Sequence, residues 1–311
     1  MLALRDGCRI LGGAAMTETI PRIDARIPVG LDPDRPSLAR VYNRLLGGKD
    51  NYRADHHAVE QFEEAAPGQC AAARRSREFQ QRVLRYLASS ARISQFLDLG
   101  AGLPSPDVMP DTHEVLQFDA RGEADRATVV YVDRDPVCVA HGRALMEVNE
   151  QTHYLLGDLT DPSLLHDPAT STYLDLTRPI GVLLCGVLHH LGDAASVVRG
   201  WVDVLPAGSF LAITHLHDPG PADPLHGYAA ACQDRYRQEF ESGWFRTREQ
   251  ITALFEGLEM VAPAPGIDPG LVAPDEWWPY GPPVRFKSVA ERLLLAGVGW
   301  KPGTPPGGSA Q

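Results

Sequence analysis

The stretch from residue 95 to residue 104, QFLDLGAGLP, constrains the fold of this chain more than any other. Its apolar letters predict a short buried strand, and Asp98 interrupts that strand just before Gly100 and Gly102. Glycine at such a turn tolerates positive φ and offers no side chain to obstruct a ligand, so the backbone can approach a bound nucleotide closely. Because short glycine motifs also occur by chance, the rest of the chain has to decide what this one binds.

From residue 93 onward, apolar strand patterns alternate with helical patterns. The predicted strands are 95–99, 128–133, 153–156, 180–185 and 209–215, and the predicted helices between them are 112–117, 136–149, 162–173 and 194–205. Near-continuous apolar strands such as GVLLCGVL suit a parallel sheet that helices cover on both faces. The alternation therefore predicts a doubly wound α/β domain whose ligands lie at the carboxyl ends of the strands.

The flanking segments predict further parts. Residues 1–35 read as a flexible leader, and residues 36–90 as a helical cap whose first helix, LARVYNRLL, has Ser37 as its N-cap. The main domain is predicted to span 91–302, with 219–283 as a variable insertion on the acceptor side. Residues 303–311, GTPPGGSAQ, predict a disordered tail.

Composition excludes several classes of partner. The formal net charge is −11, and nucleic-acid binding needs clustered Lys and Arg to meet phosphates, so a nucleic-acid partner is not expected. Arg74, Arg75 and Arg77 form the dense basic patch, which we interpret as the start of a helix over 76–87 whose charges are either paired or simply solvated. No apolar run is long enough to span a membrane.

No two of the five cysteines form a C-x-x-C pair. This pattern predicts a protein of the reducing cytoplasm that has neither a disulfide framework nor a zinc site. The oligomeric state is not indicated.

Polar side chains follow successive predicted strands. Asp133 ends the second strand, where a carboxylate can accept two hydrogen bonds from the vicinal hydroxyls of a ribose. Asp158 follows the third strand and could accept a bond from an adenine amino group, while Leu159 covers the ring. His189 and His190 follow the fourth strand. Each of these residues alone can be explained as a helix cap, a turn residue or a core residue. Because all of them follow strands of one parallel sheet, they are expected at the same edge of that sheet, which predicts a single ligand crevice there.

Two classes of nucleotide cofactor compete for this crevice. A nicotinamide dinucleotide needs a helix that starts promptly after the glycine turn, because the helix N-terminus anchors the pyrophosphate. Here Pro104, Ser105 and Pro106 begin a proline-rich loop that delays the next helix. S-adenosylmethionine has no phosphate and tolerates such a loop. It needs acids for the ribose and groups that hold its amino and carboxylate ends, so the sequence favours S-adenosylmethionine.

Eight segments, in order, resemble a family of bacterial S-adenosylmethionine-dependent methyltransferases long catalogued as a domain of unknown function. They are PSLARVYNRLLGGKDNYRADHH, FLDLGAGLPS, THEVLQ, VVYVDRDP, GDLTDP, VLLCGVLHHL, FLAITHL and LLLAGVGWKP, between residues 36 and 302. LLGGKDNY is the most specific of them, because generic methyltransferases lack it. The resemblance implies the class I methyltransferase fold, with a Rossmann-like seven-stranded sheet whose last strand, 292–299, is antiparallel.

The resemblance also implies a cofactor site. Asp98, Gly100 and Gly102 would form the first cofactor motif, Asp133 would be the ribose acid and Asp158 the adenine-side acid. From spacing alone, GGKDNY reads as a helix C-cap followed by the capped start of the next helix, and the resemblance favours instead a lid that closes over the cofactor. The predicted cofactor-binding residues are Tyr42, Gly48, Asn51 and Tyr52 of the lid and Asp98, Gly100, Ala101, Gly102, Asp133, Arg134, Asp158 and Leu159 at the strand ends.

Methyl transfer itself asks little of side chains, because the sulfonium is already an activated leaving group and the enzyme mainly aligns the acceptor. A general base is needed only for a protonated nucleophile, and His189 and His215 are the candidate catalytic residues. His190 departs from the family's aromatic or aliphatic pattern, so no shared role is assigned to it. His215, His217 and Asp218 could instead bind a metal, but no further ligand cluster is evident and no metal is predicted.

The acceptor is not identified by the sequence, and a small molecule is expected. Two other classes of function stay open. One is a non-catalytic sensor or scaffold that binds S-adenosylmethionine or S-adenosylhomocysteine, and the other is an NAD-dependent enzyme.

Overall fold

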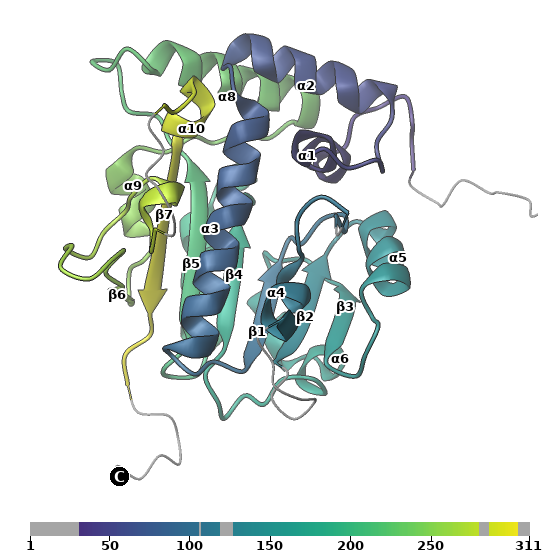
Figure 1. Ribbon diagram of the computed structural model, residues 1–311, viewed down its shortest axis with the longest axis vertical. Coiled ribbons are helices and arrows are strands. Elements are labelled where there is room, and N and C mark those ends of the chain that lie inside the picture. The colour runs from purple at the N-terminus through teal and green to yellow at the C-terminus, as the bar shows by residue number, and fades with distance from the viewer. Residues whose placement is uncertain (1–30, 106, 119–126, 280–285, 304–311) are drawn as a thin grey trace, which may run out of the picture. The chain divides into compact units, whose positions relative to one another are not determined.

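Seven strands form one mixed sheet at the centre of the structure, a computed structural model that describes residues 31–105, 107–118, 127–279 and 286–303 (Figure 1). The strands are β1 (Gln95–Leu99), β2 (Thr128–Asp133), β3 (Thr152–Leu156), β4 (Gly181–Cys185), β5 (Phe210–Leu216), β6 (Glu259–Met260) and β7 (Leu294–Trp300). Their order is β3-β2-β1-β4-β5-β7-β6. Strands β1 to β5 are parallel, and β7 runs antiparallel to both β5 and β6. The order confirms the predicted doubly wound sheet with an antiparallel last strand.

Helices and short 3-10 turns connect and cover the strands. They are α1 (Leu38–Leu46), α2 (Arg53–Ala65), α3 (Gln69–Ser89), α4 (Thr112–Phe118), α5 (Pro136–Leu145), η2 (Pro162–His166), α6 (Pro168–Ser171), η3 (Leu188–His190), α7 (Ala194–Val204), α8 (His226–Phe240), α9 (Arg248–Ala253), η4 (Pro274–Glu276) and α10 (Val289–Arg292). The sequence predicted one helix over 162–173, and that prediction is wrong. It is split into η2 and α6, because Asp161 and Asp167 each cap a new start that is followed by a proline.

The two faces of the sheet bury separate apolar clusters. Along β1, Phe96 packs into the cluster under α3, α4 and α5, whereas Leu97 and Leu99 pack into the cluster under α7 and α9. This alternation follows from the period of two in a strand. Asp98 therefore shares a face with Phe96 and points toward α3, which brings an acid from the sheet next to the N-terminal helices.

Helix α3 begins earlier than the predicted start at residue 76, so the placement of its arginines at a helix start is wrong, whereas Arg75 and Arg77 are paired, which is one of the two predicted alternatives. It starts at Gln69, after Gly68 at φ +99°, so Arg74, Arg75 and Arg77 lie inside it. Arg77 is only 7% exposed and pairs with Asp111. A buried cation normally has such a partner. The basic patch is not a solvated helix start, and one of its members faces the interior.

Helices α1, α2 and α8 meet in a third apolar cluster near the carboxyl end of β5. Ser37 caps α1 as predicted, since its hydroxyl accepts a hydrogen bond from the backbone N–H of Arg40 at 3.3 Å. Asp55 is fully buried and accepts bonds from the Arg40 side chain at 2.8 Å and from the backbone N–H of Ser37 at 3.0 Å. These bonds fix the start of α1 against α2.

Figure 1 shows α3 lying along the sheet, so this helix is part of the layer that covers the sheet as well as of the predicted cap. The division of the chain at residues 36, 91 and 303 stays a prediction. The predicted leader up to residue 30 and the tail from residue 304 lie outside the described residues. None of the described helices is long and apolar enough to cross a membrane.

Candidate active site

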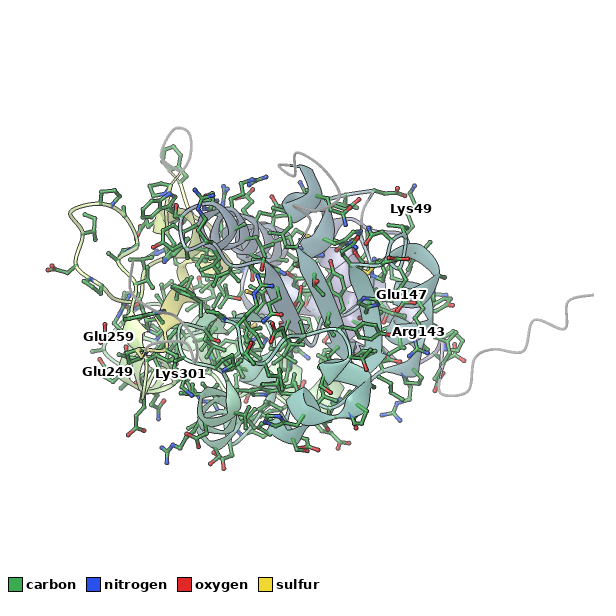
Figure 2. All side chains as sticks on the ribbon, turned by 90° about the horizontal axis from the view of Figure 1, so that it is seen from below. Lys49, Arg143, Glu147, Glu249, Glu259 and Lys301 are labelled. Atoms are coloured by element: carbon green, nitrogen blue, oxygen red, sulfur yellow. The ribbon has the colours of Figure 1, made fainter. Side chains whose placement is uncertain are left out.

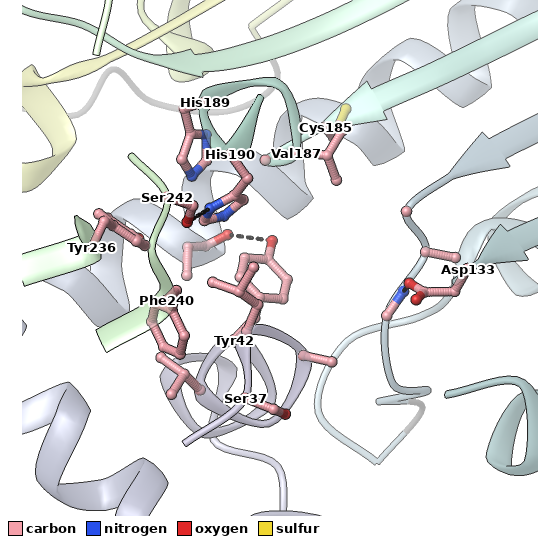
Figure 3. Close-up of a pocket in the computed structure, with 18 of the residues that line it drawn as sticks. Ser37, Tyr42, Asp133, Cys185, Val187, His189, His190, Tyr236, Phe240 and Ser242 are labelled. Carbon is pink, nitrogen blue, oxygen red and sulfur yellow. Dashed lines mark hydrogen bonds between the residues drawn. The ribbon is translucent and has the colours of Figure 1, made fainter. Parts of the chain in front are cut away.

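A cavity of about 550 Å³ lies at the carboxyl edge of the sheet (Figure 3). Its floor comes from the segments that follow β1, β2, β3 and β4, and its walls come from α1, α3 and α8. The volume falls within the range of about 300–1,000 Å³ that is usual for small-molecule sites. The site predicted from the strand ends is therefore a real cavity.

The glycine turn after β1 forms one side of the cavity. Gly100 and Gly102 have φ of +71° and +73°, a region that side chains disfavour. The Gly100 N–H donates to the carbonyl of Val132 at 2.8 Å, which fixes the turn to β2. A Cβ on Gly100 would lie 2.6 Å from a Val187 side-chain carbon, whereas a Cβ on Gly102 would meet no described atom within 4 Å. Gly100 is therefore needed for packing, and Gly102 leaves room beside the turn.

Asp133 ties the glycine turn to the end of β2. One carboxylate oxygen accepts the Gly102 N–H at 2.8 Å, and the other accepts the Asp135 N–H at 2.9 Å. Burial raises the pKa of Asp133 above its usual value. Each carboxylate oxygen retains a second lone pair, so Asp133 can still accept bonds from a ligand at the cavity wall.

The turn after β3 contributes Asp158 and Leu159 to the cavity. One oxygen of Asp158 accepts bonds from the N–H and the hydroxyl of Thr160, at 2.9 and 2.8 Å. The carbonyl of Leu159 accepts the indole N–H of Trp201 at 2.7 Å, which anchors the turn to α7. Arg134 lines the same end of the cavity, and so does Ala101.

Asp98 lies on the α3 side of the cavity and is 5% exposed. The hydroxyl of Thr112 and the side-chain amide of Gln80 donate to its Oδ2 at 2.7 and 2.9 Å. Burial raises the pKa of Asp98 to about 6, although the Thr112 bond and the nearby Arg77 guanidinium act in the opposite direction. A carboxylate this desolvated is stabilised by a cation that enters the cavity.

The start of α4 does not offer a pyrophosphate site. The N–H of His113 donates to the hydroxyl of Tyr131 at 2.8 Å, and the N–H of Asp111 donates to the side chain of Glu114 at 2.8 Å. Neither group lines the cavity. These donors are already used, which agrees with the sequence argument against a dinucleotide.

The GGKDNY segment does not line the cavity, so the predicted cofactor-binding residues Gly48, Asn51 and Tyr52 lie outside its walls in this structure. Asn51 donates to the side-chain oxygen of Asn43 at 2.8 Å and to the carbonyl of Gly48 at 2.9 Å. A Cβ on Gly48 would lie 2.4 Å from the Asn43 side chain. The segment is therefore a turn wrapped around Asn43. Lys49 extends outward from this turn and is 85% exposed (Figure 2).

Tyr52 also has a structural place outside the cavity. It precedes α2 as its N-cap, and its ring lies 5.2 Å from the Arg40 guanidinium carbon. Of the four predicted lid residues, only Tyr42 lines the cavity, and its hydroxyl donates weakly to the carbonyl of Ala73 at 3.4 Å. Ser37, the N-cap of the helix that carries Tyr42, also lines the cavity (Figure 3).

His189 and His190 line the cavity at the loop that follows β4. The Nδ1 of His189 is buried and has no hydrogen-bond partner in the described part of the chain. Burial, with smaller contributions from His190, His215 and Arg246, lowers the pKa of His189 well below its usual value. His189 is therefore a neutral imidazole at physiological pH.

His190, to which the sequence assigned no role, also faces the cavity. Its Nδ1 lies 2.9 Å from the hydroxyl of Ser242, and burial lowers its pKa to about 3. The ring of Tyr236 in α8 packs edge-on against the rings of both histidines, with centroid distances of 5.5 and 5.3 Å. Phe240 lies on the same side of the cavity, and Asp133 lies on the other side (Figure 3). The predicted acceptor-side insertion, 219–283, contains α8, but the sequence did not single out Ser242, because a contact between residue 190 and residue 242 leaves no periodic signal.

His215, the other predicted candidate base, does not line the cavity. It is fully buried on β5, with Nδ1 2.6 Å from the carbonyl of Leu216 and Nε2 2.9 Å from Nη1 of Arg246. Because a carbonyl only accepts, Nδ1 carries the proton and Nε2 accepts from the guanidinium. Burial lowers the pKa of His215 to about 3. Neither ring nitrogen is free to take a proton from a substrate.

Arg246 connects this histidine to the loop of His189. Its Nη2 donates to the carbonyls of Leu191 and Gly192 at 2.7 and 2.9 Å, and its Nη1 reaches the carbonyl of Leu188 at 3.2 Å. His215 and Arg246 thus hold the loop after β4 in place. Among the described residues, no group of three or more His, Cys, Asp or Glu could hold a metal ion, so His215, His217 and Asp218 do not form such a site.

Comparison with known proteins identifies the family. The model of the S-adenosyl methyltransferase family matches residues 24–302. The chain belongs to this family. Its cofactor is S-adenosylmethionine, and the predicted resemblance and class I methyltransferase fold are confirmed. A search of curated proteins finds no match.

Two solved structures are similar over most of the chain. One is a protein from Thermobifida fusca YX named "putative methyltransferase", with 38% identity and a TM-score of 0.78, covering 89% of this chain and 98% of that one. The other is a DUF574 family protein from Streptomyces avermitilis MA-4680, with 30% identity and a TM-score of 0.76, covering 87% of this chain and 99% of that one. Both support the same family assignment.

Proposed function

We propose that this methyltransferase moves the methyl group of S-adenosylmethionine to a small-molecule acceptor by in-line displacement inside the cavity. One observation carries the proposal. The same cavity joins the glycine turn and the acids after β1 to β3 with an apolar compartment beside α8. One end therefore suits a nucleoside, and the other suits a second small molecule.

The nucleoside end would take the cofactor. Asp133 would accept hydrogen bonds from the ribose hydroxyls, and Asp158 would accept one from the adenine amino group, with Leu159 against the ring. Gly102 leaves space for the chain that joins the ribose to the amino acid. When bound there, S-adenosylmethionine supplies a methyl group on a sulfonium that is already a good leaving group. We propose α1, with Ser37 and Tyr42, as the lid that covers it.

The other end of the cavity would take the acceptor. Its apolar walls come from Val41 and Leu45 of α1, Tyr236 and Phe240 of α8, and Leu294 at the start of β7. Burial of aromatic and aliphatic side chains at this end suits a neutral, largely apolar molecule. The residues 219–283 supply only part of this wall, since α1 and β7 supply the rest.

His189 is the residue that we propose as general base. It lines the cavity, it is neutral at physiological pH, and its Nδ1 has no partner among the described residues. A neutral imidazole can accept the proton of a hydroxyl or a thiol as the nucleophile attacks. His215 would act only as a positioning residue, because Arg246 and Leu216 already occupy its ring nitrogens.

The test is formation of S-adenosylhomocysteine from S-adenosylmethionine with a fractionated cell extract. We expect turnover with the small-molecule fraction, and a fall of roughly 100-fold for His189→Ala with cofactor affinity unchanged, since a general base contributes about 10²–10⁴-fold. His141→Ala, on α5 and outside the cavity, is the matched control. Turnover only with the macromolecular fraction would contradict the small-molecule acceptor, and cofactor binding without turnover in any fraction would favour the sensor.

A further inference from the structure

His190 and Ser242 form a hydrogen-bonded pair in the wall of the acceptor end of the cavity. Nδ1 of His190 lies 2.9 Å from the hydroxyl oxygen of Ser242. Ser242 is 6% exposed, and among the described residues its hydroxyl has no other partner. A buried hydroxyl needs an acceptor for its proton, so Ser242 donates to Nδ1. The one ring proton of the neutral imidazole is therefore on Nε2.

Nε2 of His190 is consequently a hydrogen-bond donor that the protein itself leaves unused. In the part of the chain that the structure describes, no group accepts from it, and it is not sealed in the interior. His190 is half-buried and lines the cavity. Figure 3 shows the pair on the side of the cavity that carries Tyr236 and Phe240, away from Asp133. The donor is therefore available to a molecule in the acceptor end.

The surroundings of this pair disfavour a charged acceptor. Burial and the Arg134 guanidinium lower the pKa of His190 to about 3, so a cation beside this ring is costly. Burial raises the pKa of Tyr236, so an anion is costly there as well. Glu239 and Glu241 also line the cavity, but both are more exposed than Tyr236, and water screens their charge. A neutral acceptor fits this end best.

A donor in this position also distinguishes among neutral nucleophiles. A hydroxyl oxygen has two lone pairs, so it can accept from Nε2 of His190 with one and attack the methyl group with the other. A neutral amine has a single lone pair, which the same hydrogen bond would occupy. A thiol sulfur is only a weak acceptor. The donor therefore favours a hydroxyl group as the nucleophile.

The hydroxyl group must also give up its proton to a weak base. Burial holds the pKa of His189 well below its usual value, so the proposed general base binds a proton weakly. A phenol such as the tyrosine side chain has an ordinary pKa of about 10, far below that of an aliphatic alcohol. A phenol is therefore the hydroxyl compound that this site deprotonates most readily.

Aromatic rings line the same end of the cavity. The ring of Tyr236 packs edge-on against His190 at a centroid distance of 5.3 Å and lies 6.2 Å from the ring of Phe240. Tyr42 of α1 adds a further ring to the wall. Aromatic pairs prefer offset and edge-on contacts at such distances, so these walls suit a flat aromatic ring.

We propose that the methyl acceptor is a neutral phenol whose hydroxyl oxygen accepts a hydrogen bond from Nε2 of His190, with Ser242 fixing the tautomer. The inference rests on the proposed function of the cavity and names its substrate class. A lone pair of the phenol oxygen forms the new O–CH₃ bond, and the C–S bond breaks with its electron pair left on sulfur. The phenol proton passes to His189 and then to water. The bond from His190 stabilises the negative charge that develops on the oxygen as this proton leaves.

The test compares three probes that share one ring system and differ in one group. They are 2-naphthol, 2-naphthylmethylamine, which is a cation at neutral pH, and 2-naphthoate, which is an anion. Titration calorimetry measures their affinity for the wild-type protein saturated with S-adenosylhomocysteine. 2-Naphthol should bind at least about 10-fold more tightly than either charged probe. With S-adenosylmethionine in its place, mass spectrometry should detect the methyl ether of 2-naphthol.

Substitutions at His190 test the donor itself. His190→Phe keeps a ring beside Tyr236 and should weaken 2-naphthol about 3- to 10-fold, the range of one neutral hydrogen bond, with the affinity for S-adenosylhomocysteine unchanged. His190→Gln, which offers a side-chain N–H at a similar reach, should restore most of the lost affinity. His166→Phe, at an exposed position of η2 outside the cavity, is the matched control and should change no affinity.

Nitrogen NMR of the histidine rings tests the tautomer in the wild-type protein, with His190→Gln used to assign the signals. At neutral pH, Nε2 of His190 should carry the proton and Nδ1 should not. The reverse assignment would overturn the inference. Equal binding of 2-naphthol by the wild type and His190→Phe would do the same, as would an equal loss of 2-naphthol and S-adenosylhomocysteine binding, which is the result of a merely structural role.

The probes also separate this inference from the proposed function. Tighter binding or methylation of 2-naphthylmethylamine or 2-naphthoate would overturn the phenol and leave the methyltransferase in place. Absence of binding by all three probes to protein that binds S-adenosylhomocysteine would overturn the phenol as well. Absence of S-adenosylhomocysteine binding would overturn the proposed function itself, and the inference with it.

Discussion

The burial of Asp98 predicts that this residue destabilises the ligand-free fold at neutral pH. Burial raises the pKa of Asp98 from 3.8 to about 6. Between these two pH values Asp98 is more protonated in the folded state than in the unfolded state. The contribution of Asp98 to the free energy of unfolding therefore falls as pH rises from about 4 to 6. At about 1.36 kcal/mol per pKa unit, the ionised carboxylate costs the fold about 3 kcal/mol at pH 7.

Asp98→Asn tests this cost, because the substitution removes the charge and keeps the shape. Thr112 and Gln80 can still donate to the amide oxygen. We expect the free energy of unfolding to rise by up to about 3 kcal/mol at pH 7 and the difference to approach zero near pH 4. The midpoint of thermal unfolding should rise by several degrees at pH 7, since 1 kcal/mol corresponds to about 2–4 °C in chains of about 150–250 residues.

The assay is urea and thermal denaturation of both proteins without ligand from pH 4 to pH 8, since a bound ligand would change the stability of each. The buried histidines titrate in both proteins, so they cancel in the difference. Asp203→Asn, at an exposed position of α7, is the control and should change the free energy of unfolding only slightly. The reasoning is refuted if Asp98→Asn is less stable than the wild type at pH 7, or if the difference is constant across this range.

Two further substitutions, each compared with a control substitution, test the residues that shape the cavity or hold the helices beside it. Gly100→Ala should destabilise the protein by about 1–3 kcal/mol and abolish S-adenosylhomocysteine binding, because φ is +71° and the new methyl would lie 2.6 Å from a side-chain carbon of the next loop. Gly227→Ala, in α8 with nothing within 4 Å, should instead stabilise by about 0.5–1 kcal/mol in the same denaturation assay. Asp55→Ala should cost about 3–5 kcal/mol by leaving Arg40 buried without its partner, whereas Glu256→Ala, in an exposed pair, should cost less than about 1 kcal/mol.

Much of the sheet could be predicted from the sequence. The strands predicted over 95–99 and 128–133 match β1 and β2 at both ends, and the other three parallel strands match within one residue at each end. Their apolar runs are short and bounded by polar residues, so burial alone fixes their limits. Helix α3 was harder, because its first turns are polar and contain three arginines. A buried Arg77 cannot be told from a solvated one until Asp111 is known to lie beside it.

For the candidate site too, the residues at strand ends could be predicted, whereas side-chain hydrogen bonds could not. Asp133 and Asp158 could be placed because the carboxyl ends of parallel strands meet at one edge. The GGKDNY segment has the composition of a ligand-binding loop, but the backbone N–H of Asp50 and the side-chain amide of Asn51 both donate to Asn43. Spacing could indicate a turn between two helices here, but it could not show which side chain the turn surrounds. His215 lies at a strand end as expected. Its ring is nevertheless occupied by Arg246, thirty-one residues away in the chain.

The central claim is that the cavity after β1 to β4 binds S-adenosylmethionine through its nucleoside. The most direct measurement is calorimetric titration of the wild-type protein with S-adenosylhomocysteine and with NAD, repeated on Asp133→Ala. We predict that S-adenosylhomocysteine binds the wild type, that NAD does not, and that Asp133→Ala binds at least about 10-fold more weakly, since two charge-assisted bonds to the ribose are lost. Binding of NAD alone, or equal binding of S-adenosylhomocysteine by the wild type and by Asp133→Ala, would contradict the claim.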